Sequence, residues 1–177
     1  MSGRIEAARD LATRLHEGQV RKGAERYPYI LHCREVATFT ELHGGDEVAV
    51  CAAWLHDTVE DCPPFSLEAI ASEFGPEVAR VVGELTDDKS LPSKARKALQ
   101  IENGPKKSAA ACLVKLGDKT SNCRSIATAP PVGWPLERRV AYLDWSERVV
   151  AALAHRPATA LEEFDVTLRA ARLRLGV

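Results

Sequence analysis

An apolar helical pattern is interrupted by two polar pairs in the stretch Ala53-Trp54-Leu55-His56-Asp57-Thr58-Val59-Glu60-Asp61. On a helix, the pair at 56–57 has the pair at 60–61 as its i,i+4 neighbours, so all four side chains lie within an arc of about 140°. Carboxylates packed this densely repel one another unless a cation or a proton compensates their charge. A divalent metal ion is the simplest compensation, so the stretch indicates a buried polar site on a helix.

The rest of the chain also has helical spacing. Alanine is abundant, alternation of β-branched residues is rare, and apolar residues recur at three and four positions. No repeat and no long linker divides the sequence, so we expect an all-α, single-domain helical bundle over residues 1–177. The pattern predicts helices at residues 5–16, 31–43, 46–57, 66–75, 77–85, 94–101, 108–126, 136–155 and 159–175.

The composition is that of an ordinary globular domain. The formal net charge is only -1, which gives no overall reason to expect nucleic-acid binding. The N-terminus carries charges throughout and lacks the apolar core of a signal peptide, and no apolar run is long enough for a membrane span. We therefore expect a cytoplasmic protein that contacts neither membrane nor nucleic acid, whereas a homo-oligomer remains open.

Cysteine usage argues against two kinds of small scaffold. The cysteines are five in number, which is odd, and none forms a C-x-x-C pair. A disulfide framework and a structural zinc site are therefore not expected. Cys51 and Cys112 lie in apolar runs and are expected to be small core residues, as free cysteines usually are.

Two further positions offer ligands that match the His56-Asp57 pair. His32 stands at the start of a predicted helix, and Asp118 lies within a later one. Two imidazoles and two carboxylates suit Mn²⁺, Fe²⁺ or Zn²⁺ with open coordination positions better than a closed thiolate site does. Such open positions are needed for hydrolysis, because the metal then activates water and polarises a phosphoryl oxygen.

Each of these ligands also has a plainer explanation. A lone histidine near a helix start is usually structural, and an adjacent His-Asp pair occurs by chance in many proteins. The conjunction of His32, His56-Asp57 and Asp118 in an otherwise apolar setting favours the metal site.

A set of motifs in this order is similar to a known family. The sequence resembles the hydrolase domain of the Rel/Spo alarmone enzymes in the HD superfamily, particularly the small stand-alone hydrolases related to the metazoan SpoT homologue. The similarity covers almost the whole chain. It rests on the segments Arg21-Lys22-Gly23, Pro28-Tyr29-Ile30-Leu31-His32, Leu55-His56-Asp57-Thr58-Val59-Glu60-Asp61, Leu85-Thr86-Asp87-Asp88-Lys89, Val114-Lys115-Leu116-Gly117-Asp118-Lys119 and Asn122.

The resemblance implies an HD-type helical fold and a role for each matching residue. It implies hydrolysis of the 3′-pyrophosphate of ppGpp or pppGpp to give GDP or GTP, with a nucleotide as the partner and one Mn²⁺ as the cofactor. It assigns Glu60 and Asp61 to the attacking water, as the groups that orient or deprotonate it. The implied metal ligands are His32, His56, Asp57 and Asp118, and the implied substrate-binding residues are Arg21, Lys22, Lys115, Asn122, Arg138 and Tyr142.

The basic pair can also be interpreted without the family. A departing pyrophosphate needs cations, and Arg21 and Lys22 supply two on a loop ahead of ligand His32. The alternative for this pair is a solvated loop that binds nothing.

The sequence departs from the family pattern at several positions that carry none of the predicted ligands. Cys33 stands where a proline is common, Gly117 where alanine is usual, and Thr120 where leucine is usual. Because Thr120 lies close to Asp118 in the chain, we expect it to alter the pocket for the base or the sugar.

Two other classes of function use the same residues. An HD-type hydrolase of another nucleotide, such as ppApp or NADPH, would share the metal and the water and differ in the pocket. A catalytically silent nucleotide-binding module would have no need of the Glu60-Asp61 pair, which argues against it. A plain helical scaffold does not explain the buried acidic residues.

Overall fold

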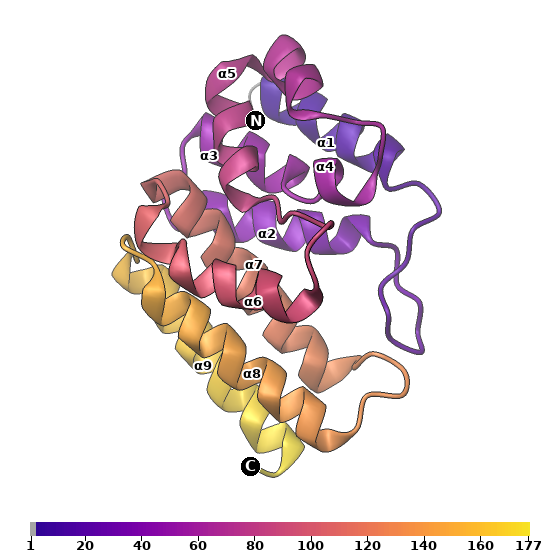
Figure 1. Cartoon of the computed structure of the whole chain (residues 1–177), viewed down its shortest axis with the longest axis vertical. Helices are drawn as coiled ribbons and strands as arrows, with labels where there is room; N and C mark the ends of the chain where they lie inside the picture. Colours follow the sequence, from indigo (N-terminus) through magenta and orange to yellow (C-terminus); the bar gives the residue numbers. More distant parts are fainter. Residues whose placement is uncertain (1–2) are drawn as a thin grey trace.

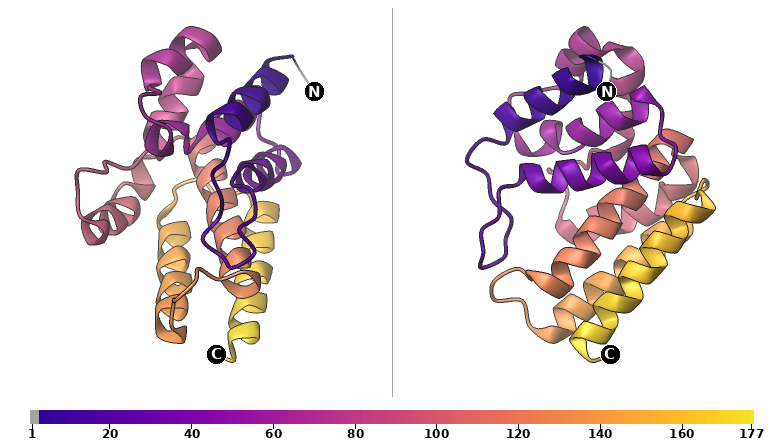
Figure 2. Two further views of the ribbon diagram at one scale, coloured as in Figure 1. Left: turned by 90° about the vertical axis from the view of Figure 1, so that its right-hand side faces the viewer. Right: turned by 180° about the vertical axis from the view of Figure 1, so that it is seen from behind.

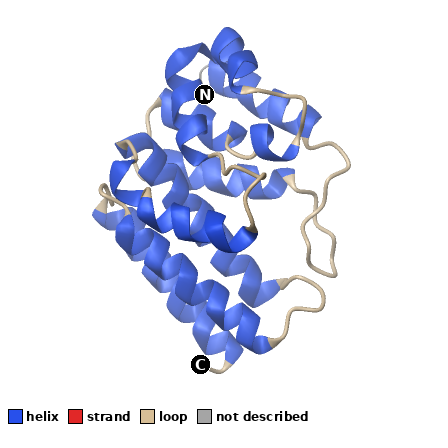
Figure 3. Cartoon of the chain, in the orientation of Figure 1, coloured by secondary structure: helices blue, strands red, loops and turns tan. Residues whose placement is uncertain are grey.

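The computed structural model describes residues 3–177, and regular structure within that range is helical apart from isolated bridges (Figures 1 and 3). The all-α prediction is therefore confirmed. The helices are α1 (Gly3–Leu15), α2 (Ile30–Leu42), α3 (Glu47–Leu55), α4 (Thr58–Asp61), α5 (Leu67–Leu85), α6 (Ser93–Glu102), the 3₁₀ helix η1 (Gly104–Lys106), α7 (Ala109–Thr128), α8 (Leu136–Ala152) and α9 (Ala158–Leu175).

Three helices begin at polar caps that the sequence supplies. The Asp46 carboxylate accepts a hydrogen bond from the Ala49 amide at 2.8 Å and caps α3. Ser66 and Ser108 cap α5 and α7 in the same way. Each cap satisfies an amide that would otherwise have no partner in the first turn, so these helix starts are encoded locally.

The helix predicted to run through Asp57 ends earlier than expected. It stops at Leu55, and the acid pair lies on the separate short helix α4. The Thr58 hydroxyl donates to the Leu55 carbonyl at 2.6 Å and so competes with the backbone for this acceptor. The backbone stays nearly helical through the turn, since the Asp61 amide still donates to the Asp57 carbonyl at 2.8 Å.

The predicted break at Gly75-Pro76 appears as a kink within α5. Gly75 has φ 81° and ψ 161°, a conformation that L side chains rarely adopt and that a helix does not contain. Proline follows at position 76 and cannot supply the amide of a continuous helix. Two helical segments, close to the two expected, therefore meet at this glycine.

Two hydrophobic clusters form the core and meet at α7. The first lies among α1, α2, α3 and α5 and includes Leu55 and Phe74. The second lies among α7, α8 and α9 and includes Leu143 and Phe164, where the three helices run side by side (Figure 2). Each such side chain contributes about 1.5–3 kcal/mol on full burial. Because α7 contributes to both clusters and also packs against α2 and α3, its middle turns are held on both sides.

The loop between α1 and α2 contacts the loop between α7 and α8 near the C-terminal end of α7. Gly23 pairs with Pro131 in an isolated bridge, and the Val132 amide donates to the Lys22 carbonyl at 3.0 Å (Figure 2). A Cβ on Gly23 would lie 2.7 Å from the Ala129 carbonyl oxygen, so only glycine allows this approach. The loop that carries Arg21 is thereby fixed against the loop that follows α7.

The predictions about cysteine and membrane segments can be compared with the structure. The five cysteines are free, and Cys51 and Cys112 are fully buried, as expected of core residues. Within residues 3–177, no helix combines the length and the apolar character that a bilayer crossing requires.

Candidate metal centre

The four predicted ligands come together from α2, α7 and the turn after α3. His32 on α2, His56 in the turn and Asp118 on α7 are buried, and each offers a ligand atom within 4.8 Å of the others. Nε2 of His32 lies 3.5 Å from Asp118 and 3.6 Å from Asp57. Nε2 of His56 lies 3.1 Å from Asp57. The side chains thus converge on one point between the two core clusters.

The arrangement at His56 fits a metal ion. Its Nδ1 lies 2.8 Å from the Ala53 carbonyl oxygen, which can only accept, so Nδ1 carries the proton and Nε2 bears a lone pair. Nε2 is buried without a hydrogen-bond partner. A buried lone pair facing carboxylates is costly when nothing bridges them, and a divalent cation supplies the missing partner.

The charges around the site keep its carboxylates ionised. Burial by itself would raise the pKa of Asp118, but the ammonium groups of Lys119 and Lys115 hold it well below its ordinary value. Burial would likewise raise the pKa of Asp57, and the imidazoles of His56 and His32 outweigh it and lower the pKa. Ionised carboxylates are the form that binds a divalent ion.

The two imidazoles respond differently to burial. Burial lowers the pKa of His32, which favours the neutral ring that a metal requires. Burial acts in the same direction on His56, but the neighbouring Asp57 carboxylate raises its pKa overall.

The acid pair lies at the edge of the site and contacts a basic rim. The Glu60 carboxylate lies 3.5 Å from Arg96 and accepts a hydrogen bond from the Asp87 amide at 3.3 Å. Asp61 pairs with Lys89. Burial raises the pKa of Glu60, and the charges of Asp57 and Asp87 add to the effect.

Four predicted substrate-binding residues line one cavity of about 200 Å³. Arg21 and Lys22 come from the loop before α2, Asn122 from α7 and Tyr142 from α8. The Asn122 amide donates to Asp118 at 2.5 Å, which connects the cavity to the metal ligands. Trp134 supplies a second aromatic ring to the same wall.

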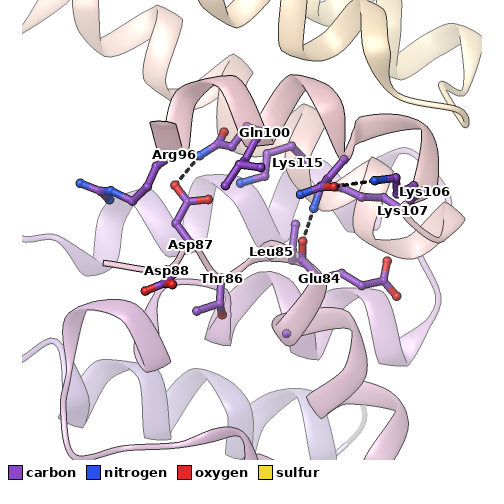
Figure 4. Close-up of a pocket in the computed structure, with 13 residues that line it drawn as sticks. Glu84, Leu85, Thr86, Asp87, Asp88, Arg96, Gln100, Lys106, Lys107 and Lys115 are labelled. Atoms are coloured by element: carbon purple, nitrogen blue, oxygen red, sulfur yellow. Dashed lines mark hydrogen bonds between the residues drawn. The ribbon is translucent and has the colours of Figure 1, made fainter. Parts of the chain in front are cut away.

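The other two predicted substrate-binding residues do not line this cavity. Lys115 is buried, lies 3.5 Å from Asp118 and faces a second cavity of about 330 Å³ (Figure 4). Figure 4 shows that cavity bounded by the end of α5, by α6 and by the start of α7, with Arg96 and Lys107 also at its wall. Arg138 stacks on Trp134, 4.2 Å from the ring centroid.

Several side chains at the site were not singled out from the sequence. The Tyr29 hydroxyl donates to Asp57 at 2.6 Å. Lys119 is buried 3.2 Å from Asp118 and 4.2 Å from the centroid of the Trp145 ring. Tyr29 and Lys119 both lie within the quoted motifs, which was the available signal. Ser121 contacts His32 directly, and Glu35 contacts Ser121; neither residue had such a signal in the sequence.

Thr120 does not lie where the sequence suggested. Its hydroxyl donates to the Leu116 carbonyl at 2.8 Å, and the side chain is buried beside Phe39 and Ser121 in a cavity between α2 and α7. It is absent from the wall of the cavity that contains Arg21 and Tyr142. Thr120 therefore does not line that cavity, because residues 120 and 122 point to different sides of α7.

Known proteins share both the sequence and the fold. A family model described as an HD domain matches residues 8–159. The human guanosine-3′,5′-bis(diphosphate) 3′-pyrophosphohydrolase MESH1 is 44% identical over 151 residues, which cover 84% of this chain and 83% of the human protein. A guanosine-3′,5′-bis(diphosphate) 3′-pyrophosphohydrolase of Haemophilus influenzae is 35% identical over 152 residues, which cover 82% of this chain and 21% of that protein.

A solved structure also has this fold. The structure is that of a metazoan SpoT orthologue that hydrolyses ppGpp. It matches with a TM-score of 0.90 at 38% identity, and the match covers 96% of both chains. The match of residues 8–159 includes all four predicted ligands, on α2, on α7 and in the turn after α3. The chain therefore belongs to the HD domain family.

Proposed function

We propose that this protein is a single-domain, metal-dependent phosphohydrolase that removes the 3′-pyrophosphate from guanosine alarmones. The observation that carries the proposal is the convergence of His32, His56 and Asp118, with Asp57 beside both rings, next to a cavity lined by Arg21 and Tyr142. The similarity to the human and bacterial 3′-pyrophosphohydrolases supports ppGpp and pppGpp as the substrates.

The four side chains would hold one divalent ion, and we propose Mn²⁺. The mixture of imidazole and carboxylate donors fits a borderline or hard ion, and the site provides no thiolate. When bound, the ion supplies Lewis-acid activation of the water and of the phosphoryl group.

The reaction breaks the bond between the 3′ oxygen of the ribose and the adjacent phosphorus. Water adds to this phosphorus, one of its protons passes to a base, and the 3′ oxygen takes up a proton as it leaves, so that GDP and pyrophosphate result. Glu60 is the proposed base, because burial and the charges of Asp57 and Asp87 raise its pKa and so make its carboxylate a better proton acceptor. Asp61, which is tied to Lys89, orients its partner at the edge of the site.

The nucleoside would occupy the cavity beside Asn122. Trp134 and Tyr142, whose ring centroids are 5.8 Å apart, offer apolar faces to a base or sugar. Arg21 and Lys22 contribute positive charge for phosphate oxygens at the same wall.

One assay tests the proposal. Metal-free protein is given Mn²⁺, Mg²⁺ or Zn²⁺ separately and is incubated with ppGpp, pppGpp, ppApp or NADPH. We expect Mn²⁺ to support conversion of ppGpp to GDP with one pyrophosphate per turnover. His155→Ala, which removes an exposed histidine, is the control and should retain full activity. Release of orthophosphate instead of pyrophosphate, or exclusive turnover of NADPH, would show that the proposed reaction is wrong.

A further inference from the structure

Two side chains connect the metal ligand His32 to the protein surface. Nδ1 of His32 lies 2.8 Å from the hydroxyl oxygen of Ser121, and that oxygen lies 2.6 Å from a carboxylate oxygen of Glu35. His32 and Glu35 lie on α2, one helical turn apart, and Ser121 lies on α7. The contacts therefore run from α2 across to α7 and back to α2.

The chemistry of the three groups fixes the direction of each hydrogen bond. An ionised carboxylate can only accept, so the Ser121 hydroxyl must donate its proton to Glu35. The hydroxyl oxygen then has only lone pairs left for His32, so Nδ1 of the imidazole must carry the ring proton. In a neutral imidazole this leaves Nε2 unprotonated, and Nε2 is the atom that faces Asp57 and Asp118.

The second histidine of the site reaches the same state by another route. His56 donates from Nδ1 to the backbone carbonyl of Ala53, an acceptor that no substitution of a side chain removes. For His32 the equivalent contact of Nδ1 is with the side chain of Ser121. The orientation of the His32 ring therefore depends on a neighbouring side chain, whereas that of the His56 ring depends on the backbone.

We propose that Ser121 and Glu35 are positioning residues that hold His32 as the Nδ1-protonated tautomer and thereby set the affinity of the site for its divalent ion. The inference deepens the proposed function and rests on the proposed metal site. Neither residue touches the reacting atoms, and both act through His32. Groups that hold the far nitrogen of a metal-bound histidine commonly change metal affinity by about tenfold to a hundredfold when they are removed.

Burial makes the contact effective. His32 and Ser121 are each 2% exposed, so water does not replace a lost hydroxyl easily. Without it, the imidazole can adopt the other tautomer, in which a proton occupies Nε2 and blocks the lone pair that a metal needs. Glu35 is partly exposed and also lies 3.8 Å from Arg124, so its removal should have the smaller effect.

The test measures both the tautomer and the metal. Metal-free Ser121→Ala, Glu35→Ala and wild type are titrated with Mn²⁺. Electron paramagnetic resonance measures the free ion at each step and so gives the affinity. Nitrogen-15 NMR of the labelled imidazoles reports the tautomer of His32 in the metal-free protein. The matched controls are Ser146→Ala, which removes another buried hydroxyl, and Glu41→Ala, which removes an exposed carboxylate of α2.

We expect wild-type His32 to be protonated at Nδ1. Ser121→Ala should populate the Nε2-protonated form and weaken Mn²⁺ binding by about tenfold to a hundredfold, with a smaller change in Glu35→Ala and none in the controls. An Nε2-protonated His32 in the wild type would overturn the proposal, as would weaker binding without a change of tautomer. If Ser121→Ala fails to fold, the proposal is still tested by the tautomer of His32 in the wild type and by the Mn²⁺ affinity of the surface variant Glu35→Ala. None of these measurements uses a nucleotide, so a wrong substrate assignment would leave them unaffected.

Discussion

The guanidinium of Arg21 donates to the side-chain oxygen of Asn122 at 2.9 Å, although 101 residues separate them in the chain. The amide of the same Asn122 donates to Asp118 at 2.5 Å. Asn122 therefore stands between the basic loop and the metal ligands, and it fixes the distance from one to the other. Substitutions in this loop should alter the binding of phosphate groups while the metal stays in place.

Lys22 is the residue of this loop on which the effect can be measured most directly. Its side chain is exposed at the cavity, while its carbonyl is held by the Val132 amide at 3.0 Å, so alanine should leave the loop in position. We expect Lys22→Ala to lower kcat/KM for ppGpp by roughly tenfold to a hundredfold, the scale of one charge-assisted phosphate contact of about 1.5–3 kcal/mol. Mn²⁺ content should not change. Unaltered steady-state kinetics would mean that the loop faces solvent and that the basic segment 94–97 holds the phosphates.

Removal of two ligands should abolish metal binding. The double variant His56→Ala/Asp57→Ala deletes the donors that lie 3.1 Å apart and leaves His32 and Asp118 alone. Metal analysis after dialysis should then find no stoichiometric Mn²⁺, whereas His155→Ala should bind one ion. One tightly bound Mn²⁺ in the double variant would show that the ion lies elsewhere. For the wild type, chelation should lower the melting temperature, since an ion that binds only the folded state stabilises it.

The acid pair should affect rate more than affinity. Glu60→Gln is nearly isosteric but cannot take up a proton, and four ligands are available without it. We expect kcat to fall by about 10²-fold or more, with Mn²⁺ affinity and nucleotide binding preserved. Asp61→Asn should cause a smaller loss, because Asp61 contacts Lys89 and acts on orientation. The measurements are steady-state kinetics and Mn²⁺ titration of both variants. Restoration of Glu60→Gln by excess Mn²⁺ would instead identify Glu60 as a ligand.

Lys107 should make stability depend on pH in the alkaline range. Burial lowers the pKa of Lys107 from its ordinary value of 10.5 to about 8, and the charge of Lys115 adds to the effect. Between these values the unfolded chain binds the proton and the folded chain does not, so this residue makes the free energy of unfolding rise with pH. Urea denaturation measures the free energy of unfolding of each protein. We expect the value for the wild type minus the value for Lys107→Met to rise from pH 8 to about 10.5. A difference that is flat across this window would contradict the prediction. Lys106→Met, at an exposed neighbouring position, is the control.

The sequence was sufficient to predict the helical class and the cluster of His32, His56 and Asp118, because helix periodicity and ligand type are local signals. It was insufficient for the orientation of these ligands. Ser121 and Glu35 look like ordinary polar helix residues, and only the packing of α2 on α7 brings them to His32. Lys115 was grouped with the nucleotide pocket. It lies on nearly the same face of α7 as Asn122 but about two turns nearer the start of the helix, where it lines another cavity.

The position of Gly117 also depends on packing between these two helices. A Cβ at this residue would lie 2.9 Å from Cδ1 of Phe39, closer than two carbon atoms can approach without a shift. The phenyl ring thus occupies the volume that an alanine methyl group would fill in the usual family pattern. The two positions form one complementary pair, so a larger side chain at position 117 needs additional room at position 39. Because Gly117 precedes ligand Asp118, a methyl group added at this residue would require a shift of the Phe39 ring or of this turn of α7, and the shape of an apolar contact thereby limits which sequences can preserve this site.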